Sequence, residues 1–203
     1  MIQISDLRQS RPLRGAFLIP PALPEVADFQ AFTQKPRQGS VPHAFSEDVA
    51  DKVHCFHRQL PNYTPTQLVS LKGLAGVWGL NEIFVKDEST RFNLNAFKVL
   101  GGSYAVARLI CRELGIGIED TSYNRLISHA VRQRIGHMTL TTATDGNHGR
   151  GVAWIAEQIG LKAVVYVPKG TARSRIENIR SHGASVEVTN LNYDDAALHY
   201  HGA

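Results

Sequence analysis

The spacing of hydrophobic and polar positions predicts alternating strands and helices in the second half of the chain. Three short apolar runs, 138–144, 162–168 and 184–190, are typical of buried strands. Helical patterns separate these runs and end at Gly160 and Gly183. Because strands that are joined by helices pair in parallel, the pattern predicts an α/β fold with a parallel open sheet and flanking helices.

The first half of the chain shows mostly helical spacing. Ser46 is expected to cap the first helix, and Leu68, Leu74 and Trp78 recur at the spacing of a second helix. Gly115 is expected to end a long apolar helix. The expected helices cover about 46–60, 66–79, 96–115 and 122–133, and a short strand covers 82–88.

The composition is that of an ordinary globular protein, with 203 residues, 43% hydrophobic, 20% charged and a formal net charge of +4. The sequence has no zinc-finger spacing, aromatic RNA-binding signature or sustained Lys/Arg run, which argues against a nucleic-acid partner. No apolar run has the length of a membrane helix, which argues against a membrane partner. The cysteines, Cys55 and Cys111, are far apart in the sequence, as expected of a reduced, cytoplasmic, soluble chain.

The stretch TTATDGNHGRG, residues 141–151, follows an expected strand, and ligands bind beyond the carboxyl ends of parallel strands. Gly146 and Gly149 permit a tight turn and the close approach of a ligand. Asn147 offers a hydrogen-bond donor and an acceptor, and Asp145 offers a base. An ordinary strand–helix turn with Asp145 as N-cap explains the loop equally well. A metal site at Asp145 and the nearby histidine lacks a third ligand, so no metal is expected.

A second informative stretch, VKDESTRFNLNAFKVLGGSYAV, places Lys98 beside Phe97 near the start of an apolar helix. The positive end of a helix and partial burial both lower the pKa of a lysine, and a neutral amine forms a Schiff base with an aldehyde. The alternative is a lysine whose aliphatic stem covers the helix edge. Gly101 and Gly102 cost helix stability, so a bulky group is expected against that turn.

Together these stretches resemble the pyridoxal-phosphate enzymes of fold type II, the tryptophan synthase β and serine/threonine dehydratase family. NYTPTQLVSLKGLAGVWGLNEIFVKDE is similar to the family's first helix and its Lys-x-Glu strand, NAFKVLGG to its lysine motif, and DGNHGRGVAW to its cofactor loop. Most dehydratases have serine or glycine near the position of Asp145. Asp145 and the Asn-Ala-Phe-Lys sequence are instead similar to the diaminopropionate ammonia-lyases of this family.

The resemblance implies roles for particular residues. Lys98 would bind pyridoxal 5'-phosphate and act as a base at Cα of the substrate, and Asp145 would be the base on the opposite face. Asn147 would hydrogen-bond the 3′-oxygen of the cofactor, Gly146 would shape the loop, and Phe97 would pack near the ring. The implied reaction is α,β-elimination of 2,3-diaminopropionate to pyruvate and ammonia. The implied partner is a small amino acid, and the implied full-length enzyme is a homodimer.

The resemblance also implies a domain organisation with an incomplete large domain, because the family's phosphate loop and C-terminal half do not follow the last strand. The chain is therefore expected to be C-terminally truncated. A serine or threonine dehydratase and a non-catalytic remnant or subunit piece are the alternative functions. The expected segments are an extended N-terminal arm (1–45), the N-terminal part of the large domain (46–100), a small βαβ domain with the cofactor loop (101–195) and an atypical tail (196–203).

Overall fold

The structure, a computed structural model, describes residues 42–144, 146–191 and 195. The described residues all belong to the compact unit that spans residues 41–203. Almost all of the expected N-terminal arm, Asp145 and the tail 196–203 lie outside the described residues.

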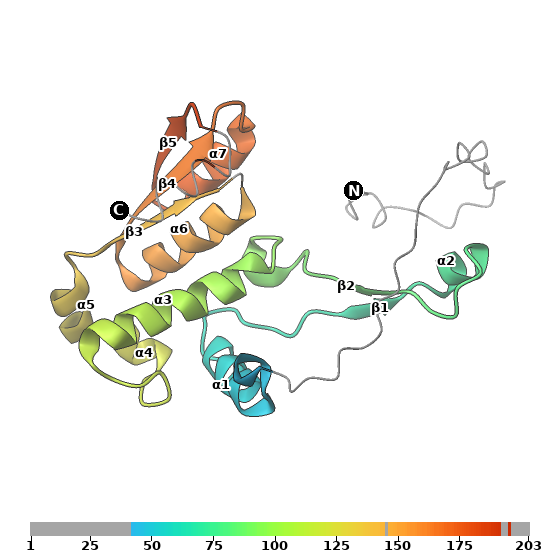
Figure 1. Cartoon of the computed structure of the whole chain (residues 1–203), viewed down its shortest axis with the longest axis horizontal. Coiled ribbons are helices and arrows are strands. Elements are labelled where there is room, and N and C mark those ends of the chain that lie inside the picture. The colour runs from blue at the N-terminus through green and yellow to red at the C-terminus, as the bar shows by residue number, and fades with distance from the viewer. Residues whose placement is uncertain (1–41, 145, 192–194, 196–203) are drawn as a thin grey trace. The chain divides into compact units, whose positions relative to one another are not determined.

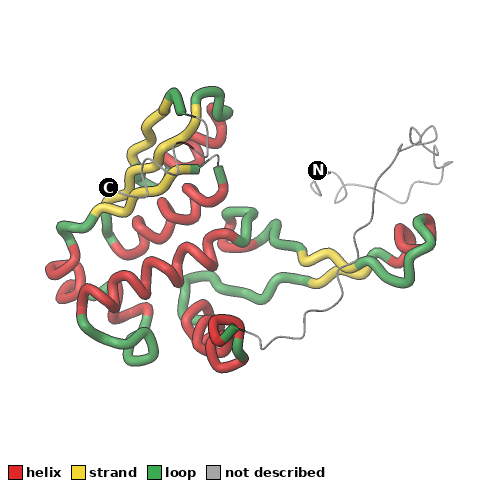
Figure 2. Tube along the Cα trace, viewed as in Figure 1, coloured by secondary structure: helices red, strands yellow, loops and turns green. Residues whose placement is uncertain are grey.

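Three parallel strands form the sheet that the sequence predicts (Figures 1 and 2). They pair in the order β3-β4-β5, with Thr139 opposite Lys162 and Val164 opposite Ser185. Val165 in the middle strand is fully buried. The strands are β3 (Thr139–Ala143), β4 (Lys162–Pro168) and β5 (Ser185–Thr189), joined by helices α6 (Asn147–Ile159) and α7 (Arg173–Arg180). The expected α/β class with a parallel sheet is confirmed.

Helix α6 separates the sheet from α3 (Lys98–Leu114), and the two helices run side by side (Figure 1). The core between these layers is apolar, with Ala107 and Ile110 of α3 and Ile155 and Ile159 of α6 fully buried. Helix α3 ends at Gly115, whose left-handed φ of 69° is the helix stop that the sequence predicts. Helix α1 (Glu47–His57) follows the expected Ser46 cap and packs on α3.

The predicted helix over residues 66–79 is wrong in its first part. Residues 68–70 form strand β1 (Leu68–Ser70), which pairs antiparallel with β2 (Phe84–Lys86), and only α2 (Lys72–Val77) is helical. The pairing continues past both strand ends, because Leu71 N donates to Ile83 O at 2.9 Å and Asp87 N donates to Gln67 O at 2.9 Å. These bonds to a distant segment outweigh the local helical spacing.

Two further predicted elements differ in their bounds. The helix expected over 122–133 is two helices, α4 (Tyr123–Leu126) and α5 (His129–Ile135), because Ser128 has an extended backbone and its side chain caps Val131 N. The loop expected over 145–150 is shorter, since α6 already begins at Asn147. Two 3₁₀ turns, η2 (His43–Phe45) and η3 (Arg91–Asn93), complete the described elements.

The expected boundary at residue 100 falls inside α3, and the division into two domains there stays a prediction. A packing partner for Gly101 and Gly102 is not found among the described residues, because a Cβ at either position meets no atom within 4 Å.

Candidate functional site

The loop after β3 is held by Thr144, which is 1% exposed. Its Oγ1 accepts hydrogen bonds from Gly146 N at 3.0 Å and from Gly149 N at 3.1 Å. A helix leaves its first backbone N–H groups without partners inside the helix. The threonine supplies one for Gly149, which is why α6 begins at Asn147, earlier than the sequence pattern indicates. Asn147 is exposed at this helix start.

Gly149 brings the first turn of α6 down onto the end of the sheet. A Cβ at this position would lie 2.3 Å from Thr144 Cγ2 and 2.7 Å from Val165 Cγ1. A side chain at residue 149 would therefore have to displace Thr144 and Val165. A Cβ at Gly146 would lie 3.3 Å from Cδ of Arg175 in α7. Arg175 thus borders the loop, although the sequence analysis did not single it out.

Lys98 is the first residue of α3 and is exposed, so the partial burial expected for it is wrong. Phe97 immediately before it is 62% exposed. The chain segment just before Lys98 has an unusual backbone, because Phe92, Asn93 and Asn95 have positive φ values of 48°, 58° and 56°. Left-handed backbone is costly for residues with a Cβ, and such clusters are typical of functional sites.

Packing of α6 against α3 brings the two stretches together. A Cβ at Gly151 would lie 3.0 Å from Val99 Cα, 3.2 Å from Val99 N and 3.5 Å from the carbonyl carbon of Lys98. The neighbouring Arg150 donates from Nη1 to Leu94 O at 3.0 Å. Helix α6, which follows the loop after β3, therefore contacts the backbone both before and after Lys98. Sequence reasoning missed Arg150, although it lies inside the GNHGRG motif.

A buried ion pair anchors the same turn from its other side. Arg91 is 5% exposed, and its Nε and Nη2 donate to the carboxylate of Glu88 at 2.7 and 3.0 Å. Its Nη1 donates to Thr64 O at 2.9 Å, and Nη2 also donates to Thr66 Oγ1 at 3.0 Å. The hydrogen bonds from Arg91 hold the pKa of the Glu88 carboxyl below its usual value. Every guanidinium nitrogen of Arg91 thus has a partner.

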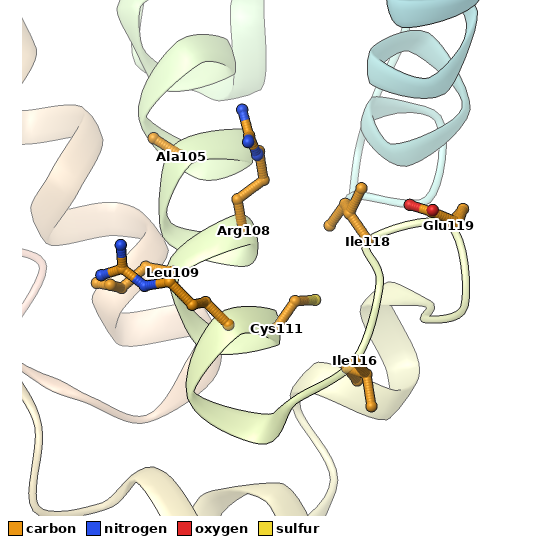
Figure 3. Close-up of a pocket in the computed structure, with 8 residues that line it drawn as sticks. Ala105, Arg108, Leu109, Cys111, Ile116, Ile118 and Glu119 are labelled. Atoms are coloured by element: carbon orange, nitrogen blue, oxygen red, sulfur yellow. The ribbon is translucent and has the colours of Figure 1, made fainter.

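A pocket of about 680 Å³ lies along the C-terminal half of α3 (Figure 3). Arg108, Cys111 and Arg112 of the helix and Glu119 of the following loop are among the residues that line it. Burial raises the pKa of the Cys111 thiol. The pocket is separate from the Lys98 turn, because Lys98 begins the same helix and the pocket begins two turns later.

Among the residues that the structure describes, no group of three or more His, Cys, Asp or Glu side chains is arranged to hold a metal ion. No helix in this part of the chain has the length and apolar character needed to cross a membrane.

Comparison with known proteins gives consistent matches. The family profile described as pyridoxal-phosphate dependent enzyme matches residues 60–202. A diaminopropionate ammonia-lyase of Salmonella typhimurium is 48% identical over 174 residues, which are 85% of this chain and 43% of that relative. The crystal structure of the Escherichia coli diaminopropionate ammonia lyase in apo form matches with a TM-score of 0.73 and 46% identity, covering 81% of this chain and 44% of that chain.

The same Escherichia coli enzyme, in complex with an aminoacrylate-PLP azomethine reaction intermediate, matches with a TM-score of 0.71 and 44% identity. That match covers 81% of this chain and 40% of that chain. The chain therefore spans less than half the length of the relatives that it matches.

Proposed function

Because the chain belongs to the family of pyridoxal-phosphate dependent enzymes, we propose that it supplies part of the active site of a 2,3-diaminopropionate ammonia-lyase. Identity of 48% to a relative with that name supports the substrate class. The structural observation that carries the proposal is the contact of Gly151 with the backbone of Lys98 and Val99. Because of this contact, the start of α3, which carries the exposed Lys98 amine, lies beside α6.

The residues at this junction fit the chemistry of pyridoxal phosphate. Lys98, exposed at a helix start, would hold the aldehyde carbon through its amine. Asn147, exposed at the start of α6, would donate to the 3′-oxygen, and Phe97 would lie against the ring. Gly146, which has no side chain, would let the loop backbone approach the cofactor. The cofactor, when bound, supplies an electron sink that stabilises negative charge at Cα of an amino acid.

Two side chains would carry out the proton transfers of the proposed reaction. Lys98 would remove the Cα proton from one face of the substrate and Asp145 from the other, which would admit both enantiomers. The electron pair left at Cα then forms the Cα–Cβ double bond as the β-amino group leaves as ammonia. Water hydrolyses the resulting 2-aminoacrylate to pyruvate and a second ammonia, so all atoms are accounted for.

We expect a homodimer in the cytoplasm that acts on a small amino acid. The free thiols of Cys55 and Cys111 are consistent with a reducing compartment.

The first experiment measures cofactor attachment on the chain as it exists. The protein is titrated with pyridoxal phosphate, its absorbance is recorded, and the adduct is reduced with borohydride and located by mass spectrometry. We expect a saturable adduct at Lys98 that Lys98→Ala abolishes. Lys162→Ala, which removes an exposed lysine at the start of β4, is the matched control and should leave the adduct unchanged.

Labelling spread over several lysines, with no loss of saturable adduct in Lys98→Ala, would overturn the proposed cofactor site. Substrate class is tested by pyruvate release from D- and L-2,3-diaminopropionate and from L-serine. Turnover of L-serine without turnover of diaminopropionate would favour a dehydratase instead.

A further inference from the structure

Arg150, near the start of α6, is incompletely paired among the described residues. Its side chain is half-buried, and burial lowers its pKa. Nη1 donates to Leu94 O at 3.0 Å, whereas Nε is buried without a hydrogen-bond partner. Among the described residues, no carboxylate forms an ion pair with it. A buried guanidinium nitrogen without a partner costs stability. The hydrogen bond from Arg150 to Leu94 is therefore not explained by a gain in stability.

The carbonyl that Arg150 holds belongs to a turn with three positive-φ residues that are not glycine. Left-handed residues at Phe92, Asn93 and Asn95 surround Leu94, which is itself buried. Trp154, one helical turn beyond Arg150, lies against Phe92 with the ring centroids 5.1 Å apart. Helix α6 therefore contacts this turn at two points on one face.

The strained turn leads directly into Lys98. On its far side Arg91 is fixed by Glu88, and on its near side Gly151 contacts the backbone of Lys98 and Val99. Without the bond from Arg150, the left-handed residues between these two anchors have lower-energy backbone conformations available. A change there would redirect the start of α3 and hence the Lys98 amine.

We propose that Arg150 is a positioning residue, which holds the Leu94 carbonyl so that the strained turn presents the Lys98 amine in a fixed direction. The inference rests on the proposed function, in which Lys98 carries the cofactor. It assigns to the arginine after Gly-Asn-His-Gly a role toward the lysine of a different motif rather than toward the loop in which it lies.

The test compares Arg150→Met, which keeps the aliphatic stem, with Arg132→Met. Arg132 Nη2 donates to Gln158 O at 3.3 Å, so the control also removes a bond between an arginine and a carbonyl of α6, at the other end of that helix. Amide hydrogen exchange is followed by mass spectrometry in peptides covering 92–98 and 162–168. The rate of borohydride-trapped adduct formation at Lys98 is measured in parallel.

We expect Arg150→Met to speed exchange in 92–98 about tenfold, as loss of one hydrogen bond to a charged group predicts, with exchange in 162–168 unchanged. The adduct at Lys98 should form several-fold more slowly. Arg150→Lys, which keeps one donor, should be intermediate in both measurements, and Arg132→Met should match the wild type. If Arg150→Met does not fold, Arg150→Lys against Arg132→Lys makes the same comparison.

Equal exchange in the Arg150 and Arg132 variants would overturn the inference, as would exchange that rises equally in 92–98 and 162–168. Faster exchange with an unchanged rate at Lys98 would also overturn it, because the turn would then not direct the amine. If the wild type forms no adduct at Lys98, the proposed function fails. The exchange rates then decide whether Arg150 fixes the turn.

Discussion

At the residue scale, the contact of Gly149 with Thr144 and Val165 gives the sharpest prediction. Because a Cβ at residue 149 would lie 2.3 Å from Thr144 Cγ2, Gly149→Ala must displace buried side chains. Overpacking of this kind costs about 1–3 kcal/mol, and we expect the upper end of that range because both contacting side chains are buried. Urea denaturation followed by circular dichroism measures the loss.

Gly101→Ala is the matched control for this prediction. Residue 101 is exposed within α3, and a Cβ there meets no described atom within 4 Å. Alanine is a better helix former than glycine, so this variant should gain about 0.5–1 kcal/mol. An equal effect of the two substitutions would contradict the packing explanation for Gly149.

Some residues of the candidate site could be predicted from the sequence, and others could not. The motifs around Lys98 and Asn147 were recognisable because their chemistry is local: an amine before two glycines, and an amide between glycines. Arg150 was not recognisable, because its one partner is the backbone carbonyl of Leu94, which only the folded chain brings near. Arg91 was not recognisable either: its ion pair with Glu88 is local, but its bonds to Thr64 and Thr66 form only in the folded chain. The role of Asp145 stays a prediction, since that residue lies outside the described part of the chain.

At the element scale, His57 links α1 to α3 and makes their packing sensitive to pH. Its Nε2 donates to Leu100 O at 2.8 Å. Burial holds the pKa of His57 below its ordinary value; the bond to Leu100 opposes this shift, and Arg91 and His54 add smaller effects in the direction of burial. The unfolded chain therefore takes up a proton at a higher pH than the folded chain. This contribution to stability is complete above about pH 6.5 and is lost as the pH falls through the folded pKa.

His57→Gln keeps a donor for the Leu100 carbonyl but does not titrate. We expect it to flatten the fall in the urea midpoint of the wild type between pH 7 and pH 5. His54→Gln, on the exposed face of the same helix, should retain nearly all of the wild-type pH dependence, because His54 lowers the pKa of His57 less than burial does. If both variants follow the wild type, the buried imidazole is not the group responsible.

The elements differed in how well their sequence determined them. The strands β3, β4 and β5 were predictable because each is a short apolar run between helices that end in glycine. Leu68 and Leu71 have the spacing of a helix, yet they pair with residues 83–86, a long-range contact that no local period reports. The break at Ser128 is a capping interaction inside a polar stretch, where hydrophobic periodicity gives little signal.

At the scale of the whole molecule, apolar side chains gather on the β1–α2–β2 hairpin. Val77 is 79% exposed and Trp78 is 62% exposed. Leu68 and Phe84 lie on one face of the strand pair, since their register partners are Lys86 and Ser70. Leu74 and Leu80 are also exposed. Several large apolar residues on one small element are typical of a surface that associates with protein, whereas single ones are common on any surface.

The isolated chain is therefore expected to self-associate through this hairpin. Sedimentation velocity at increasing protein concentration should show the mean sedimentation coefficient rising for the wild type. The double variant Val77→Ser, Trp78→Ser should sediment as a monomer over the same range, with a free energy of unfolding changed by only about 0.5 kcal/mol because both side chains are already exposed. Phe45→Ser removes a side chain that is 77% exposed on η2, away from the hairpin in the sequence, and should associate as the wild type does. Equal monomerisation by both variants would show that total exposed apolar area, rather than its concentration on the hairpin, drives association.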